Sequence, residues 1–307
     1  MRVSHTLRLA AAAGLGATAL TVVGLAAPAQ AKVADPAACL TPTPNAEASS
    51  ARGGAAGLDH RDISAAEQRA IARRTSSRLA AKGVTASGSA SAAPAAPVTI
   101  PVHVHVMRDA AGNGNVTNSQ ITRQISVLNS SFSGTGYSFE LVSTERYNNN
   151  TWHRDRSSAT YRSLTRKGGA NALNIWFVNF KYLGIATFPW DYAKNGDIDG
   201  IRVHYDSVPG GSITNFNLGE TATHEAGHWL GLYHTFQGGC TELNDEVADT
   251  PAQSGPTSGC PEGRDSCPLP GLDPIHNYMD YSWDSCYTEF TAGQDVRMDD
   301  AWAAYRA

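Results

Sequence analysis

Long apolar segments are scarce in this chain of 307 residues. The only extended one, Leu9–Ala27, follows Arg2 and Arg8 and precedes the tetrapeptide PAQA, whose two alanines have cleavage-site spacing. We interpret residues 1–31 as a signal peptide for secretion; a membrane anchor and an ordinary buried helix are the alternatives. No later segment is apolar enough to span a bilayer, so no membrane association is expected after cleavage.

Basic residues are in deficit over most of the chain. From residue 96 onward, 14 Lys and Arg stand against 23 Asp and Glu, a net charge of −9, whereas residues 32–95 carry a net charge of +3. Nucleic-acid-binding domains need a basic face, so the acidic part of the chain is not expected to bind nucleic acid. The opposite charges should attract the two parts to each other.

Cysteines are also few. Four of the five lie in the last third of the chain, at positions 240, 260, 267 and 286. An exported protein can oxidise four cysteines in three different pairings. Cys39 is left over, and an odd cysteine in an exported protein calls for an explanation.

Residues 32–97 differ in composition from the rest of the chain. The stretch DHRDISAAEQRAIARRTSSRLAAKG predicts a helix that stops at Gly83. The Ala/Ser/Pro stretch TASGSASAAPAAP after it has no means of packing a core. We interpret residues 32–97 as a pro-segment and linker; a permanent flexible spacer is the alternative.

A folded domain is expected from residue 98 to residue 307. Alternating and β-branched patterns predict strands, and periodic patterns predict helices. Strands are expected within 98–109, 137–147, 171–180, 183–190 and 199–205, and helices within 118–132, 161–170 and around residue 224. The remaining Gly-, Pro- and Cys-rich sequence has little regular pattern. This order favours an α+β fold with a mixed sheet and an irregular C-terminal part.

The stretch HEAGHWLGLYH, residues 224–234, contains the strongest chemical signal. His224 and His228 lie four residues apart, on one face of a helix. Gly231 can adopt the left-handed conformation that ends a helix, after which His234 can return to the same point. Three imidazoles leave one tetrahedral position on zinc open, as in catalytic sites. Glu225 lies close enough on the helix to reach a metal ion held by the histidines or a molecule bound to that ion.

The spacing H-E-x-x-H-x-x-G-x-x-H resembles the metzincin zinc peptidases. HNYMDYS contains Met279, which fits their methionine turn. Within the metzincins, the chain resembles the pappalysin family, in particular its small secreted microbial members. The matching stretches, found mostly between Leu183 and Met298, are THEAGHWLGLYHTF, GGC, DEVADTP, GCP, DSCP, PIHNYMDYSWDSC and FTAGQ.

The resemblance implies a metzincin-type zincin fold. A mixed twisted sheet and an active-site helix would occupy residues 98–234, and a C-terminal subdomain stapled by disulfides would occupy residues 235–307. The family pairing would join Cys240 to Cys267 and Cys260 to Cys286. Such bridges stiffen a region with little core of its own.

The implied activity is that of a secreted zinc endopeptidase, expected as a monomer and made as a zymogen. A zinc-bound water would attack polypeptide substrates, with Glu225 as general base. Tyr281 matches a family tyrosine that can reach the zinc, and would either stabilise the oxyanion or act as a switch next to the zinc. The alternatives are a non-catalytic, zinc-stabilised surface binding protein and a zinc hydrolase of small amides or esters.

The resemblance also implies how substrates bind. A peptide would add as a strand to an exposed edge, here formed by Gly184, Ile185, Ala186 and Thr187. Asp284 lies in the loop after the methionine turn, where metzincins build the pocket for the residue after the cut. A carboxylate there would favour Arg or Lys by charge pairing.

Two further sites are implied by the family. Its members carry calcium in the loop NDEVADTP, where the ligands would come from Asp245, Val247, Asp249 and Thr250. Their pro-segments carry a cysteine whose sulfur fills the open zinc position, and Cys39 in ACLTPTP resembles it. The pro-segment would then inhibit the enzyme through Cys39, because a thiolate is a good zinc ligand.

Overall fold

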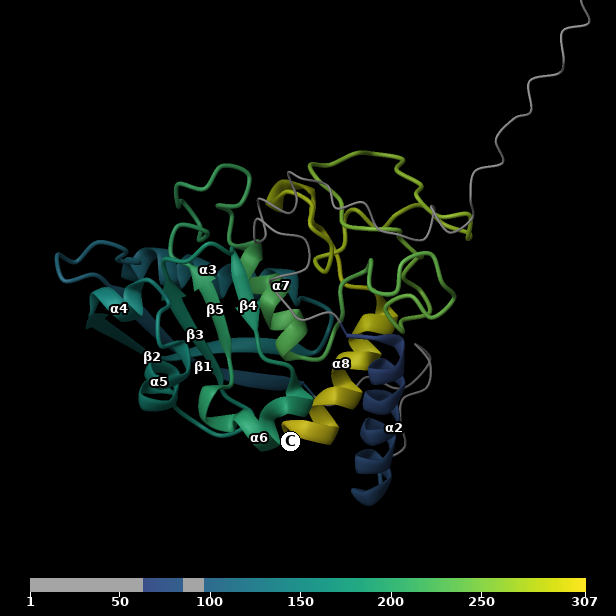
Figure 1. Cartoon of the computed structure of the whole chain (residues 1–307), viewed down its shortest axis with the longest axis horizontal. Helices are drawn as coiled ribbons and strands as arrows, with labels where there is room; N and C mark the ends of the chain where they lie inside the picture. The colour runs from purple at the N-terminus through teal and green to yellow at the C-terminus, as the bar shows by residue number, and fades with distance from the viewer. Residues whose placement is uncertain (1–62, 85–96) are drawn as a thin grey trace, which may run out of the picture. The chain divides into compact units, whose positions relative to one another are not determined.

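The computed structural model describes residues 63–84 and 97–307 (Figure 1). The predicted signal peptide, Cys39 and most of the Ala/Ser/Pro linker lie outside these residues. Within them, no helix is long and apolar enough to cross a membrane.

A five-stranded sheet organises residues 97–204. Its strand order is β2-β1-β3-β5-β4, and only β4 runs antiparallel to its neighbour. The strands are β1 Val98–Arg108, β2 Tyr137–Asn148, β3 Leu173–Val178, β4 Gly184–Ala186 and β5 Ile201–His204. All six residues of β3 are buried, as expected for a strand covered on both faces.

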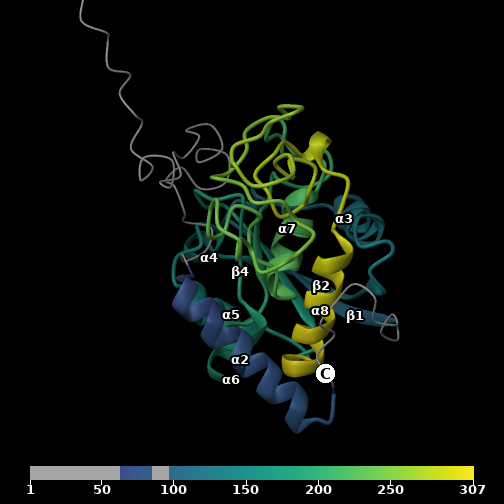
Figure 2. The same cartoon turned by 90° about the vertical axis from the view of Figure 1, so that its right-hand side faces the viewer.

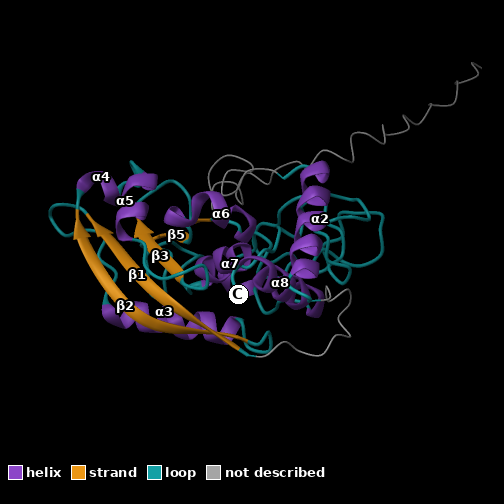
Figure 3. Cartoon of the chain, turned by 90° about the horizontal axis from the view of Figure 1, so that it is seen from below, coloured by secondary structure: helices purple, strands orange, loops and turns teal. Residues whose placement is uncertain are grey.

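Helices lie on both sides of this sheet. Figure 3 shows α3 on one side of the strands and α4 and α5 on the other. The α-helices are α2 Ala65–Ala81, α3 Asn118–Ser131, α4 Asn150–His153, α5 Ser158–Thr165, α6 Tyr192–Asn195, α7 Glu220–Trp229 and α8 Ala292–Tyr305; short 3-10 turns span Pro189–Asp191, Gly196–Ile198 and Asp284–Cys286. The largest apolar core joins side chains of the sheet, α3, α7 and α8.

The elements agree with the expected α+β plan but differ at their ends. Helix α3 is capped by Thr117, because Thr117 and Gln120 form a reciprocal capping box. The strand expected within 183–190 is only three residues long, since Pro189 begins a 3-10 turn. Helix α8 was not expected; its signal is a second capping box, formed by Thr291 and Gln294.

Two disulfides connect the irregular region that precedes α8. They join Cys240 to Cys267 and Cys260 to Cys286, which is the pairing that the family resemblance implies. Each closes a loop of fewer than thirty residues, with sequence separations of 27 and 26. Because few regular elements hold residues 235–291, these crosslinks restrict the unfolded chain where packing contributes least.

Helix α2, the first described element, packs alongside α8 (Figures 1 and 2). Ile63, Ile71 and Leu79 are at most 2% exposed. They share one apolar cluster with aromatic side chains such as Trp190 and Tyr233. The helix therefore belongs to the packed structure, although it precedes the linker.

Candidate active site

Helix α7 carries the first two histidines of the motif, beside β4 (Figure 1). His224 and His228 are fully buried. Their Nε2 atoms lie 3.1 Å apart, and the Nε2 atom of His234 lies 3.1 Å from that of His228. The three side chains therefore point their ring nitrogens at one place.

The turn after α7 explains how His234 reaches that place. Gly231 has φ +106°, a conformation that favours glycine. The amide of Leu232 donates to the Gly227 carbonyl at 3.0 Å, and that of Gly231 donates to the His228 carbonyl at 2.9 Å. These two bonds define a Schellman motif, which reverses the chain within three residues of His228.

The hydrogen bonds of the histidines suit a metal. Nδ1 of His224 lies 2.7 Å from the Tyr278 carbonyl, and Nδ1 of His228 lies 2.8 Å from the Leu232 carbonyl. A carbonyl only accepts, so both Nδ1 atoms carry the proton and both Nε2 atoms present lone pairs. Such lone pairs repel unless a cation lies between them. Two nitrogens on a tetrahedral zinc lie about 3.3 Å apart, close to the observed spacing.

One other group of candidate ligands occurs among residues 63–84 and 97–307: Cys260, His276 and Cys286. Its two cysteines form a disulfide, so their sulfurs are not available as thiolates. The chemistry therefore favours the three histidines as the metal site.

Glu225 is fully buried between α7 and β4. A Cβ atom at Gly184 would lie 2.3 Å from Glu225 Oε1, closer than real contacts allow. Gly184 is thus the residue that lets β4 approach the carboxylate. β4 itself is the last strand of the sheet, so the expected substrate-binding edge lies directly beside Glu225.

Met279 and Tyr281 both lie close to the segments that carry the three histidines. Met279 is fully buried, and a Cβ atom at Gly227 would lie 2.4 Å from its sulfur. The methionine therefore packs against the backbone of α7. The Tyr281 ring lies 4.9 Å from the His234 ring between centroids, which brings the tyrosine next to the candidate metal site.

The other predicted substrate residues have structural partners. Thr187 donates from its hydroxyl to Asp199 Oδ1 at 2.8 Å, and Ile185 pairs with Arg202 of β5. Asp284 is 3% exposed, and its Oδ2 accepts from the amides of Leu218 and Gly219 at 2.9 and 3.2 Å. The Asp284 carboxylate is thus fixed to the segment that begins α7.

The candidate calcium loop brings together three of its four predicted residues. Asp245 Oδ1 accepts from the Thr250 hydroxyl at 2.6 Å, and that hydroxyl also lies 2.8 Å from the Val247 carbonyl. The Asp249 carboxylate turns away, accepting from the Thr291 hydroxyl and the Gly293 amide at 2.7 and 2.8 Å. The start of α8 attracts it, because helix N-termini favour negative charge.

Burial raises the pKa of Asp245 to about 7. Its Oδ2 atom is buried and has no hydrogen-bond partner within the described part of the chain. A buried carboxylate oxygen of this kind is costly unless a proton or a cation neutralises it.

Comparisons with known proteins agree with this geometry. A family model described as pregnancy-associated plasma protein-A matches residues 178–303. An extracellular metalloprotease of Colletotrichum graminicola is 48% identical over 240 residues, which cover 76% of this chain and 86% of the relative. The chain belongs to the pappalysin family of metzincin metalloproteases. This pappalysin is also 48% identical over 232 residues to an extracellular metalloprotease of Verticillium alfalfae, covering 73% and 82% of the two chains.

Solved structures of mirolysin from Tannerella forsythia resemble this pappalysin. Mature mirolysin in complex with a cleaved peptide has a TM-score of 0.59 and 29% identity, and the match covers 67% of this chain and 91% of that one. A promirolysin mutant has a TM-score of 0.64 and 26% identity, with coverage of 78% and 89%. The expected metzincin-type α+β fold is confirmed.

The family fixes the general activity. The pappalysin is a secreted zinc metalloendopeptidase that is made as a zymogen. The alternatives of a non-catalytic surface binding protein and of a hydrolase for small amides or esters are therefore set aside.

Sequence reasoning missed three charged residues near this site. Arg297 and Arg306 of the α8 region and Asp199 before β5 contact the backbone and side chains around α7. Single arginines on a helix carry no recognisable signal, because their partners are distant in sequence.

Proposed function

We propose that His224, His228 and His234 hold the catalytic zinc and that Glu225 is the general base for peptide-bond hydrolysis. The observation that carries the proposal is the convergence of three Nε2 atoms, two of which are fixed as lone-pair donors by Nδ1–H bonds to carbonyls. When bound, zinc lowers the pKa of a coordinated water and polarises the scissile carbonyl. Glu225, beside the substrate edge, accepts the proton and returns it to the leaving amine.

Tyr281 is proposed to stabilise the developing oxyanion. Its ring packs against both His234 and His224, with centroid separations of 4.9 and 5.7 Å. A phenolic hydroxyl held there can donate a hydrogen bond to charge that develops next to the histidines.

Peptide substrates are proposed to add to β4 as an extra strand, along Gly184–Thr187. β4 pairs on one side with β5 and is the last strand of the sheet.

Asp284 is proposed to select Arg or Lys as the residue after the scissile bond. Its two backbone hydrogen bonds hold the carboxylate in one orientation, which suits a pocket that reads charge.

We propose residues 1–31 as signal peptide, residues 32–97 as pro-segment and linker, and residues 98–307 as catalytic domain, with Cys39 as the inhibitory ligand. The packing of α2 on α8 supports an intramolecular pro-segment.

We further propose that calcium binds between Asp245, the Val247 carbonyl and Thr250, with Asp249 joining after a side-chain rotation. The orphaned Asp245 oxygen supports this cation.

One experiment tests the proposed chemistry. The full chain and its Glu225→Ala variant are expressed with their export signal, and the enzymes are collected from the medium. Both should contain one zinc per chain, and only the wild type should create new cleavage sites in a denatured protein digest. The role of Glu225 would be refuted if the zinc-loaded wild type cleaved no peptide bonds, or if the variant cleaved them as well as the wild type.

The pocket assignment is tested in the same digest. Arg or Lys should be enriched immediately after the wild-type cuts, and Asp284→Asn should lose that enrichment. Unchanged enrichment in the variant would reject Asp284 as the selecting residue. Treating the unprocessed zymogen with a thiol-reactive reagent should release activity if Cys39 maintains latency, and unaltered latency would count against it.

A further inference from the structure

The turn between His228 and His234 has carbonyl groups that the helix itself does not satisfy. The last turn of an α-helix leaves carbonyls without intrahelical partners. The Schellman motif uses those of Gly227 and His228. The carbonyls of Trp229 and Gly231, which point out of the same turn, need donors from elsewhere.

Two arginines from the α8 region supply these donors. Arg306 Nε donates to the Trp229 carbonyl at 2.9 Å, and Arg297 Nε donates to the Gly231 carbonyl at 2.8 Å. Each guanidinium also lies over an aromatic ring of the same turn. Arg306 is 3.6 Å from the Trp229 ring centroid, and Arg297 is 4.2 Å from that of Tyr233. The turn is thus held at both ends by equivalent contacts.

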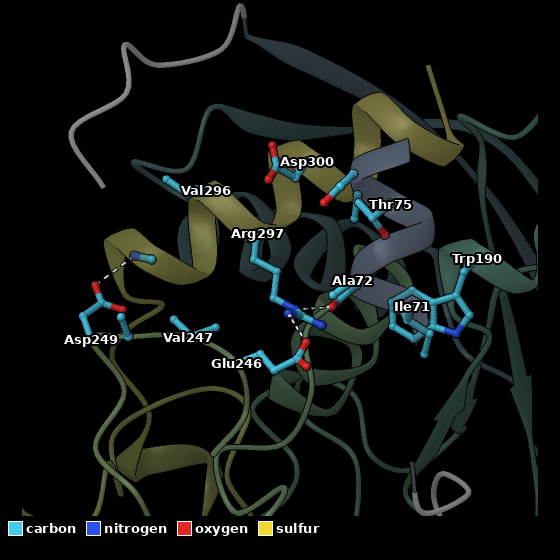
Figure 4. A pocket seen from close by; sticks show the side chains of 15 residues that line it. Ile71, Ala72, Thr75, Trp190, Glu246, Val247, Asp249, Val296, Arg297 and Asp300 are labelled. Carbon is cyan, nitrogen blue, oxygen red and sulfur yellow. Dashed lines mark hydrogen bonds and ion pairs between the residues drawn. The ribbon is translucent and has the colours of Figure 1, made fainter. Parts of the chain in front are cut away.

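A carboxylate fixes each guanidinium in turn. Asp199 accepts from Nη1 and Nη2 of Arg306 at 3.1 and 3.3 Å, and both side chains are at most 1% exposed. Glu246 pairs with Arg297 at 3.2 Å. Figure 4 shows Arg297 reaching from α8 toward Glu246. Both residues line a cavity of about 450 Å³. The arginine side chains therefore have little freedom to move.

We propose that Arg297 and Arg306 are positioning residues that clamp the Trp229–Tyr233 turn and so hold His234 in register with His228. The turn contains a glycine with positive φ and spans only five residues between the two ligands. A shift of its backbone moves His234 directly. Cations at a helix C-terminus also oppose the negative end of its dipole. The inference rests on the proposed zinc site, because it assigns a reason for this geometry.

Arg306 is also connected to the substrate edge through Asp199, whereas Arg297 has no such connection. Asp199 also accepts from the Trp229 indole at 2.9 Å and from the Thr187 hydroxyl at 2.8 Å. Thr187 directly follows β4, the proposed substrate strand. Arg306 therefore connects the metal-binding turn to the substrate edge through one buried carboxylate, whereas Arg297 acts on the turn alone.

Lysine substitutions test the clamp. A lysine keeps the charge but cannot donate to a carbonyl and a carboxylate in the planar fork of arginine. For Arg297→Lys and Arg306→Lys we expect the zinc dissociation constant, measured by chelator competition, to rise about tenfold, and kcat to fall about tenfold, as for other groups that orient metal ligands. KM should stay constant in Arg297→Lys and rise in Arg306→Lys.

The matched control is Arg146→Lys. Arg146 on β2, at the other edge of the sheet, also donates to a carbonyl, that of Val116 at 3.1 Å. The Arg146→Lys substitution should leave zinc affinity and kinetics unchanged. Wild-type zinc affinity and kcat in both clamp variants, even with a lower melting temperature, would overturn the inference. If Arg306→Lys is not secreted, Arg297→Lys alone decides. A wild type that binds no zinc would instead refute the proposed function itself.

Discussion

At the scale of single residues, the active site depends on how closely backbone approaches side chain. Gly184 and Gly227 both occupy positions where a methyl group would overlap a functional neighbour, Glu225 in one case and Met279 in the other. Neither glycine has a positive φ, so space alone explains them. The absent side chain at Gly184 lets β4 lie close to the Glu225 carboxylate.

Gly184→Ala should therefore impair catalysis more than folding. The new Cβ would meet Glu225 Oε1 at 2.3 Å, so the carboxylate or the strand must move. We expect kcat/KM to fall at least about tenfold, because misplacing a catalytic group by about 1 Å can cost a hundredfold, while zinc content stays constant. Gly169→Ala is the control, since its Cβ would meet only the Asn171 side chain, at 3.2 Å. Equal kinetics in the two variants would contradict the steric argument.

A buried histidine predicts a pH dependence of stability. His105 of β1 is fully buried, and its Nε2 lies 2.9 Å from Asn174 Oδ1. Burial lowers the pKa of His105 from 6.5 to about 4. Between these values the unfolded chain binds a proton that the folded chain does not, so stability falls as the pH falls from 6.5 toward 4.

The wild type should lose roughly 3 kcal/mol through His105 over that window, at about 1.4 kcal/mol per pKa unit. Chemical denaturation of wild type and His105→Gln at several pH values measures this loss. The variant should show a shallower decline, because glutamine does not titrate; the carboxylates and other histidines are common to both proteins. Parallel declines would show that His105 does not contribute.

At the scale of elements, α8 organises the C-terminal subdomain around α7. The Gly293 amide in its first turn donates a hydrogen bond to Asp249. Arg297 in the middle of the helix donates to the Gly231 carbonyl, and Arg306, just after the helix ends, donates to the Trp229 carbonyl. The calcium-loop candidate contacts the same helix through Glu246 and Asp249. A cation in that loop would therefore stiffen the support of the turn between His228 and His234.

Calcium should raise the melting temperature of the wild type. Binding to the folded state alone stabilises it by mass action, and the Asp245 carboxylate would be neutralised by the cation. Melting is measured in calcium and in a calcium-selective chelator. Asp245→Asn removes the charge at the same volume and should abolish most of the difference. A wild type that is insensitive to calcium would reject the site.

At the scale of the whole molecule, α2 and the domain it packs on differ in charge and lie on either side of a linker. The buried Ile71 and Leu79 face aromatic side chains of the domain. The Lys82 ammonium donates to the carbonyls of Ala303 and Ala307 at 2.8 and 2.9 Å. Helix α2 is thus held at a surface formed by α8 and the Trp190 region.

Ile71→Ala should destabilise the zymogen by about 2–5 kcal/mol, the usual cost of such a core truncation. If α2 leaves with the pro-segment, the matured enzyme from the same variant should melt like the wild type. The exposed Arg73→Ala on the same helix serves as control. Equal melting of variant and wild-type zymogens would contradict the observed burial of Ile71.

The sequence by itself determined the chemistry and the class of fold. Alternating patterns mark strands with one buried face, and the continuous apolar run of β3 marks a strand that is buried on both faces. The spacing of His224, His228 and His234 predicts a metal site, because helical geometry and one glycine suffice to bring the three side chains together. The sequence did not reveal the length of β4 or the existence of α8, whose signals are a proline and a capping box.

Only the tertiary structure decided how the site is supported. Arg297 and Arg306 act on carbonyls 66 and 77 residues away along the chain, and Asp249 caps a helix 44 residues away. Such partners share no period or spacing, so sequence reasoning cannot pair them. Local geometry placed the three histidines on one helix and the turn after it, whereas long-range packing determined what holds that turn in place.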